Sequence, residues 1–163
     1  MNLQALPGVG LAAVFVAAGV LYLLALLWVI SRFSGWSRLG QRFGTTEEFR
    51  GEAWSWQSAR FRGWCSYNNC LKVGASPEGL SFAVMRVMFP LRFFHPSLLI
   101  PWREIEVETG KAFFGFYDTA RFRIGTEERV AVTIYGKLVT RVREAAGVDW
   151  PLYNIEQMEA RRQ

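Results

Sequence analysis

Two cysteines and one histidine are the side chains of this chain best suited to nucleophilic or metal chemistry. Cys65 and Cys70 are separated by four residues, and His95, the only histidine, lies between Phe94 and Pro96. A closed zinc site needs four ligands, and two thiols with one imidazole are too few unless carboxylates join them. A nucleophile–base pair of Cys65 and His95 is chemically reasonable, but nothing in their spacing brings them together. We expect structural or free thiols, and a loop histidine that bonds to the backbone.

The acidic residues and the glycines also lack a catalytic pattern. The acidic pairs at 47–48 and 127–128 stand in polar surroundings typical of solvated turns. The glycines at 35, 40 and 44 have neither the spacing nor the preceding strand of a phosphate-binding loop. We therefore expect no enzymatic activity, no cofactor and no metal.

Residues 9–30 contain no charged side chain and are long enough to cross a bilayer, which takes about 20 apolar residues. The first ten residues hold no Lys or Arg, and the apolar run is long and not followed by a small-residue cleavage site, which speaks against a signal peptide. We predict an uncleaved transmembrane anchor over residues 1–31. Ala13 and Ala17 have the spacing of a close helix–helix contact, so a homodimer through this helix is a minor alternative.

Charge predicts the orientation of this anchor. Four arginines follow the apolar run within twenty residues, whereas no Lys or Arg precedes it. The positive-inside rule then places the N-terminus outside and the rest of the chain in the cytoplasm, at the inner membrane. The net charge of +5 favours anionic partners. A membrane surface is the expected one, because no nucleic-acid-binding motif is visible.

Residues 32–44 repeat an apolar side chain every three to four positions, with arginines between. The apolar positions are Phe33, Trp36, Leu39 and Phe43, and the arginines are Arg32, Arg38 and Arg42. One interpretation is an amphipathic helix with its aromatic rings at headgroup depth and its arginines at the lipid phosphates. The other is a linker that merely connects the anchor to a domain.

Residues 45–147 read as a β-rich domain, followed by a tail over 148–163. Apolar and polar residues alternate over 104–108, 119–124 and 129–134, which predicts strands. Further strands are expected over 54–62, 67–74, 80–87 and 111–117, and a loop over 89–101. From 137 to 146 the apolar period becomes helical, and Gly147 supplies a stop. We expect Trp102 in the core and Trp150 to fold back onto the domain.

About seven strands followed by one helix resemble pleckstrin-homology-like and GRAM-like domains. A local pattern adds to the resemblance: residues 73–80 form a strand, a turn and Gly79-Leu80, and residues 100–105 read Ile-Pro-Trp-x-x-Ile. Bacterial membrane-anchored members of that superfamily carry this pattern. The resemblance implies a membrane-anchored α+β fold, with a β-barrel or sandwich closed by a C-terminal helix. A fold does not assign an activity.

The resulting functional prediction is a cytoplasmic interaction or scaffolding module tethered to the membrane, with other proteins as partners. The first alternative is a sensor of anionic lipid headgroups or of the membrane surface. Its candidate binding residues are Arg32, Trp36, Arg38, Arg42, Arg60, Arg62, Lys72 and Arg92. The less favoured alternative is an enzyme that uses Cys65 or His95, which requires a thiol of lowered pKa.

An aromatic and basic stretch at 86–94 has two interpretations. Phe89, Phe93 and Phe94 stand there with Arg86 and Arg92. If the stretch projects, it has the composition to enter a leaflet or to contact a partner. We expect it to be buried against the sheet instead.

Overall fold

The computed structural model describes residues 6–112, 114–125 and 129–151. Its helices are α1 Leu6–Ser34, α2 Trp36–Phe43, α3 Phe89–Arg92 and α4 Lys137–Ala146. Its strands are β1 Gly44–Thr45, β2 Glu52–Phe61, β3 Cys65–Ser76, β4 Gly79–Val84, β5 Ser97–Pro101, β6 Ile105–Ala112, β7 Tyr117–Ile124 and β8 Val130–Tyr135. Single turns of 3-10 helix cover Trp102–Glu104 and Gly147–Asp149.

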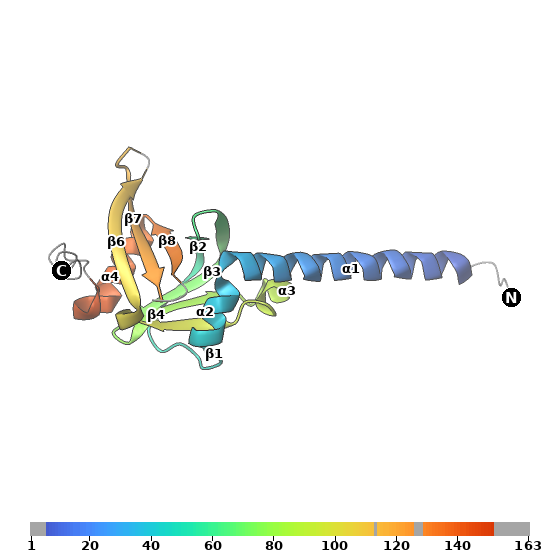
Figure 1. The fold of residues 1–163 in the computed structure, drawn as a ribbon, viewed down its shortest axis with the longest axis horizontal. Helices are drawn as coiled ribbons and strands as arrows, with labels where there is room; N and C mark the ends of the chain where they lie inside the picture. Colours follow the sequence, from blue (N-terminus) through green and yellow to red (C-terminus); the bar gives the residue numbers. More distant parts are fainter. Residues whose placement is uncertain (1–5, 113, 126–128, 152–163) are drawn as a thin grey trace.

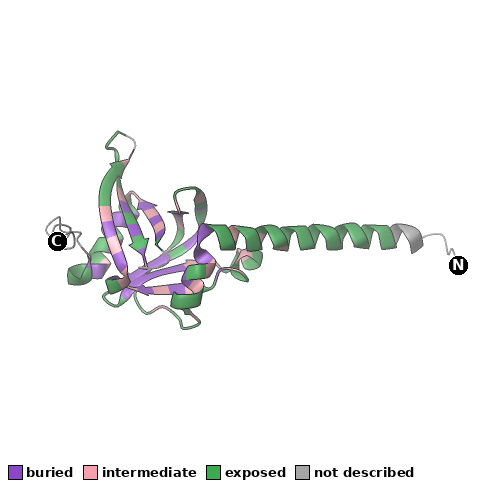
Figure 2. Cartoon of the chain, viewed as in Figure 1, coloured by how far each residue is buried: buried purple, intermediate pink, exposed green. Residues whose placement is uncertain are grey.

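The helix α1 projects from one end of a β-rich body (Figure 1). Its segment Gly10–Ser34 has a mean hydropathy of 2.7 over its most apolar window, and none of that window is buried inside the protein. Figure 2 shows α1 exposed along almost its whole length, in contrast to the strands. The helix is therefore long and apolar enough to span a membrane.

All eight strands form one antiparallel sheet in the order β1-β5-β4-β3-β2-β8-β7-β6. Strand β2 pairs with β3 along its length, and at Arg60 and Phe61 it also pairs with β8. The sheet turns at β2, so that β3, β4 and β5 form one layer and β6, β7 and β8 another (Figure 1). Its ends, β1 and β6, are not neighbours in this order. The sheet is therefore open, and neither the expected closure into a barrel nor the count of seven strands is confirmed.

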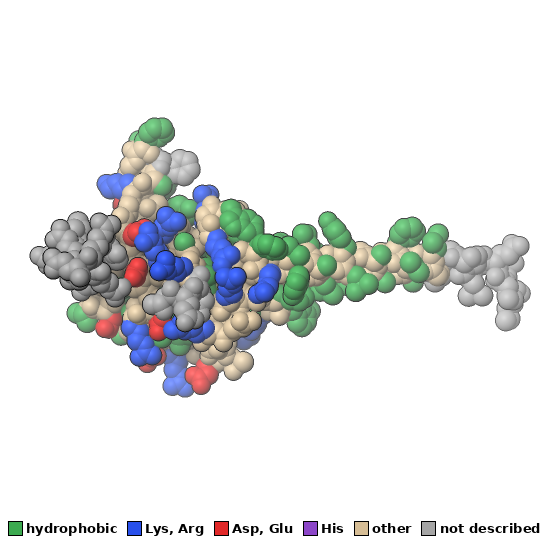
Figure 3. Space-filling view, in the orientation of Figure 1, with side chains coloured by type: hydrophobic (Ala, Val, Ile, Leu, Met, Phe, Trp, Pro, Cys, Tyr) green, Lys and Arg blue, Asp and Glu red, His purple; other side chains and the backbone are tan. Residues whose placement is uncertain are grey.

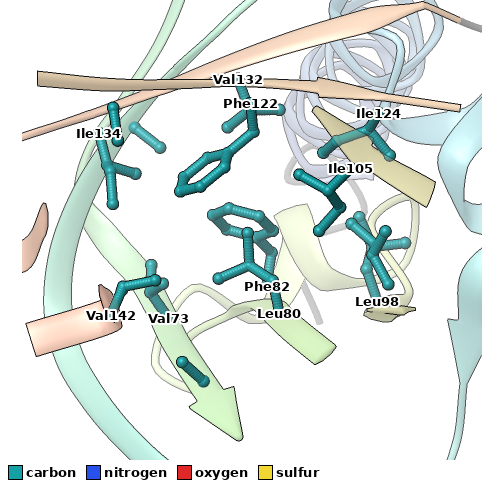
Figure 4. Close-up of a cluster of buried hydrophobic side chains, with 14 of the residues drawn as sticks. Val73, Leu80, Phe82, Leu98, Ile105, Phe122, Ile124, Val132, Ile134 and Val142 are labelled. Atoms are coloured by element: carbon teal, nitrogen blue, oxygen red, sulfur yellow. The ribbon is translucent and has the colours of Figure 1, made fainter. Parts of the chain in front are cut away.

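The core fills the space between the two layers. Phe82 of β4 and Phe122 of β7 are fully buried, and they point toward each other across it (Figure 4). The C-terminal helix is confirmed as α4, whose apolar side chains Leu138, Val139, Val142 and Ala146 are buried. Trp102 and Trp150 are buried as expected, with their ring centroids 5.8 Å apart.

Two expected segments fold differently. The predicted loop over 89–101 contains α3 and β5, and Leu98 and Ile100 of β5 are buried alternately against the core. A proline at either end of β5 is typical of a loop in the sequence, and the strand is too short for its alternation to be recognised. The two halves of the local pattern are paired, because Gly79 lies opposite Pro101. A side chain on Gly79 would collide with the carbonyl oxygen of Ile100.

The strand expected over 111–117 is instead the end of a hairpin. Strands β6 and β7 remain paired as far as Ala112 and Tyr117. Between them the backbone reverses, with Gly115 at a φ of 94° in the left-handed region that glycine adopts readily. The aromatic content of this segment suggested a strand, but residues 114–116 form a turn.

Candidate functional site

The C-terminal end of α1 is built into the β domain. Ser31 donates its hydroxyl to the carbonyl of Phe94 at 2.6 Å, and Ser34 donates to the carbonyl of Ser31 at 3.2 Å. Both serines are buried. Gly35 then turns the chain into α2 with a φ of 86°, and a side chain at this position would meet Val130 at 2.9 Å. The joint between the two helices is therefore closely packed against Val130 of β8 and the side chain of Arg62.

Trp36 follows this joint and lies at the centre of an aromatic cluster. Its ring centroid lies 4.9 Å from that of Phe61, 5.4 Å from Tyr67 and 5.2 Å from His95. Its indole N–H donates to the carbonyl of Pro96 at 2.9 Å, which satisfies the polar atom of a fully buried ring. Trp36 was a candidate for lipid contact in one of the two interpretations of residues 32–44, and the structure instead encloses its ring in the domain.

The other apolar residues of α2 are also turned toward the domain. The segment is amphipathic as predicted, but its apolar residues Trp36, Leu39 and Phe43 are all buried in the domain. They face the core of the domain and not its surroundings. The core of the domain consequently begins at the end of α1, upstream of residue 45.

His95 is fully buried at the same junction. A carbonyl can only accept, so Nδ1 donates to the Leu91 carbonyl at 2.8 Å, and Nε2 of the neutral ring accepts from the Tyr67 hydroxyl at 2.8 Å. The Tyr67 oxygen also lies 3.1 Å from Oγ of Ser34. Burial lowers the pKa of His95 against the opposing effect of the Leu91 carbonyl, and burial raises the pKa of Tyr67. The predicted backbone bond of His95 is confirmed, and its two nitrogens are both engaged.

The two thiols lie beside this network without the features of an activated nucleophile. Cys65 is half-buried and Cys70 is buried, and both are free. Burial raises the pKa of each thiol, although a hydrogen bond with Tyr67 partly offsets the effect at Cys65. A reactive cysteine needs a lowered pKa. Within the described ranges, no three His, Cys, Asp or Glu side chains lie close enough together to hold a metal ion.

The basic residues proposed to bind lipid or a partner lie on several different elements of the structure. Arg42 forms an ion pair with Glu104 at 3.1 Å. Arg60 donates to Ser66 at 3.2 Å, and Lys72 lies six residues beyond Ser66 on β3, which is about 20 Å along a strand. Arg62 is half-buried at the β2–β3 turn, whereas Arg32, Arg38 and Arg92 are exposed.

Several aromatic side chains are exposed where α1 leaves the domain. Phe89 and Phe93 are 65% and 67% exposed, with their ring centroids 4.9 Å apart. The expectation that residues 86–94 are buried against the sheet is therefore wrong for these two rings. Met88 and Leu91 of the same segment pack against the core instead. Phe33 and Trp64 are also largely exposed. Figure 3 shows hydrophobic side chains continuing from α1 onto this end of the domain, with Lys and Arg side chains beside them. We call Phe33, Trp64, Phe89 and Phe93 the aromatic collar.

A second exposed aromatic group lies at the end of the β6–β7 hairpin. Phe116 is 83% exposed, and Phe114 and Tyr117 are exposed as well. Figure 1 shows this hairpin projecting sideways from the body, across the direction of α1. We call Phe114, Phe116 and Tyr117 the aromatic tip. Sequence reasoning missed it because these residues were assigned to a strand, although Gly115 among four aromatic residues is a turn signal.

Comparisons of the chain with protein-family models, with curated proteins and with solved structures found no match.

Proposed function

We propose that this chain is a membrane-tethered interaction module without catalytic activity, whose β domain holds a protein partner at the cytoplasmic face of the membrane. In this proposal α1 is an uncleaved anchor with its N-terminus outside. The arginines that follow α1 favour this orientation. The domain would be pleckstrin-homology-like, which is supported by strands β2 to β8 followed by the core-packed helix α4.

The observation that carries the proposal is the docking of α1 into the domain. A cleaved leader leaves the mature protein, whereas the last turn of α1 supplies two buried serines that bond within the fold. The next helix places Trp36 in the core. The anchor and the domain therefore form one unit, and the domain has a fixed orientation relative to α1.

The aromatic tip is the surface best placed to meet a protein partner. Large exposed apolar groups that stand together are uncommon on monomeric proteins and mark interaction sites. Aromatic side chains are also the residues that contribute most to binding energy in protein interfaces. The tip projects across the direction of α1 and away from the end where α1 emerges (Figure 1). That position favours a protein over the bilayer as its partner.

The alternatives have less support from the site. A headgroup-specific pocket needs several cations in one place, and Arg60 and Lys72 lie too far apart to share a phosphate. An enzyme using Cys65 needs a thiolate and a free base. Burial raises the pKa of that thiol, and both nitrogens of His95 are occupied.

Site-specific photo-crosslinking of the full chain in its native membrane tests the proposal. We expect p-benzoylphenylalanine in place of Phe116 to give one dominant protein adduct, and the same group in place of exposed Lys72 to give none of it. The purified partner should then bind the chain in lipid nanodiscs, and Phe114→Ser with Phe116→Ser should weaken this binding. Equal adducts at both positions, or binding that survives both serines, would contradict the proposal.

A further inference from the structure

We propose that the aromatic collar is a membrane-contact surface, which sits in the interfacial layer of the bilayer around the root of α1. This inference rests on the proposed anchoring role of α1. It goes beyond that role, because it assigns the lipid interface as the ligand of part of the domain itself.

The segment around α3 has an inner and an outer side. Met88 and Leu91 pack against the core, whereas Phe89 and Phe93 point outward and contact each other edge to face. Leaving two phenyl rings in water forgoes the favourable burial of a large apolar surface. An apolar or interfacial environment would recover this free energy.

A hydrogen bond and packing contacts hold this segment beside the end of α1. Ser31 of α1 bonds to the carbonyl of Phe94, the residue after Phe93. The helix α3 lies beside the end of α1 (Figure 1). Ile30, one residue before Ser31, packs against the same core. The outward rings of α3 therefore lie level with the last turns of α1.

The length of α1 places this level at the edge of the hydrocarbon. The apolar segment Gly10–Ser34 has 25 residues, which is about 37 Å of helix at about 1.5 Å per residue. The hydrocarbon core is about 30 Å thick. An upright helix would therefore extend about 7 Å beyond the hydrocarbon. Arg32 in the last turn of α1 favours the interfacial layer at the end that carries the collar.

The composition of the collar fits that layer. Trp is enriched at membrane interfaces, Phe is common on the apolar faces of interfacial helices, and arginines beside them reach the phosphates. Arg32 precedes Phe33, Arg92 precedes Phe93, and both arginines are exposed. Trp64 belongs to the β2–β3 turn, and Arg62 of the same turn reaches within 3.0 Å of the side-chain position at Gly35.

Lipid is the occupant that the position of the collar favours. The apolar window of α1 is not buried by the protein at all, so acyl chains must surround it in a bilayer. Lipids that line α1 on the side of α3 then meet Phe89 and Phe93 directly. A second copy of the chain is the competing occupant, and the experiment below separates the two.

The test uses the full chain in nanodiscs of phosphatidylethanolamine and phosphatidylglycerol, with p-benzoylphenylalanine at one position at a time. Positions 89 and 93 report on the collar, position 15 on the anchor, and position 116 on the aromatic tip as a matched exposed control. We expect lipid adducts, read by mass spectrometry, at 15, 89 and 93, and at most a trace at 116.

Each other outcome overturns the inference in a distinguishable way. Lipid adducts at 15 without adducts at 89 and 93 would reject the collar and leave the anchor intact. The absence of lipid adducts at 15 would reject the anchor, and the collar with it. Adducts between two copies at 89 or 93 would identify a dimer interface, and equal lipid yields at 116 would show that the collar has no preference for lipid.

Discussion

Tyr67→Phe tests the junction between α1 and the domain with the smallest possible change. The substitution keeps the ring that packs against Trp36 and Phe61. It removes the hydroxyl that donates to Nε2 of His95 at 2.8 Å and that also lies near Ser34 and Cys65. His95 is fully buried, so no water replaces the lost donor. Leaving one buried acceptor without a partner costs about 1–3 kcal/mol. For a domain of this size we expect the midpoint of thermal unfolding to fall by about 4–12 °C.

Near-ultraviolet circular dichroism of the full chain in detergent micelles measures this change, because seven tryptophans report on the tertiary structure. Tyr135→Phe is the matched control, since Tyr135 is half-buried and its ring lies beside Arg60 at the surface. The control should change the free energy of unfolding by no more than about 0.5 kcal/mol. If Tyr67→Phe proves as mild as its control, the hydroxyl does not make the bond on which the junction argument depends.

Three further measurements probe the same region. Gly35→Ala should lower the free energy of unfolding by more than Gly63→Ala. Both glycines have a positive φ, which costs a side chain about 1–2 kcal/mol, but only at Gly35 would the added methyl group meet neighbouring atoms. Equal effects would show that the joint is loosely packed. Burial lowers the pKa of His95 below its ordinary value of 6.5, so below that pH the unfolded chain binds a proton that the folded chain does not. The free energy of unfolding should therefore be constant above about pH 6.5 and fall as the pH drops toward 5. His95→Gln should flatten this slope, and an unchanged slope would assign it to other groups. Burial raises the pKa of both Cys65 and Cys70, so iodoacetamide should alkylate them more slowly in the folded than in the unfolded chain at neutral pH. Faster alkylation in the folded chain would instead support a reactive cysteine.

The elements that could be predicted are those whose sequence pattern carries its own period. Strands β7 and β8 alternate cleanly, and α4 has one apolar face closed by Gly147. The helix α1 is defined by composition alone. These signals are local, so they survive without any knowledge of neighbouring segments.

What could not be predicted depends on contacts between distant segments. The period of α2 shows which of its faces is apolar, but the same face would suit a bilayer or a protein core. Only the position of Phe61 and Tyr67 beneath Trp36 decides between them. The bond between Tyr67 and His95 joins residues 28 positions apart. No spacing rule anticipates it, because it requires the pairing of β3 with β4 and the fold of the segment that follows.

The packed joint at Gly35 has a mechanical consequence for an anchored chain. An apolar helix longer than the hydrocarbon is thick tilts in order to bury its length, and its tilt angle changes with bilayer thickness. A flexible linker would absorb that rotation. Here the joint is held by Val130 on one side and by the buried serines of α1 on the other. In a membrane-anchored chain, the domain would follow a change in the tilt of α1 as one body, and the parts of the domain far from the joint would be displaced most.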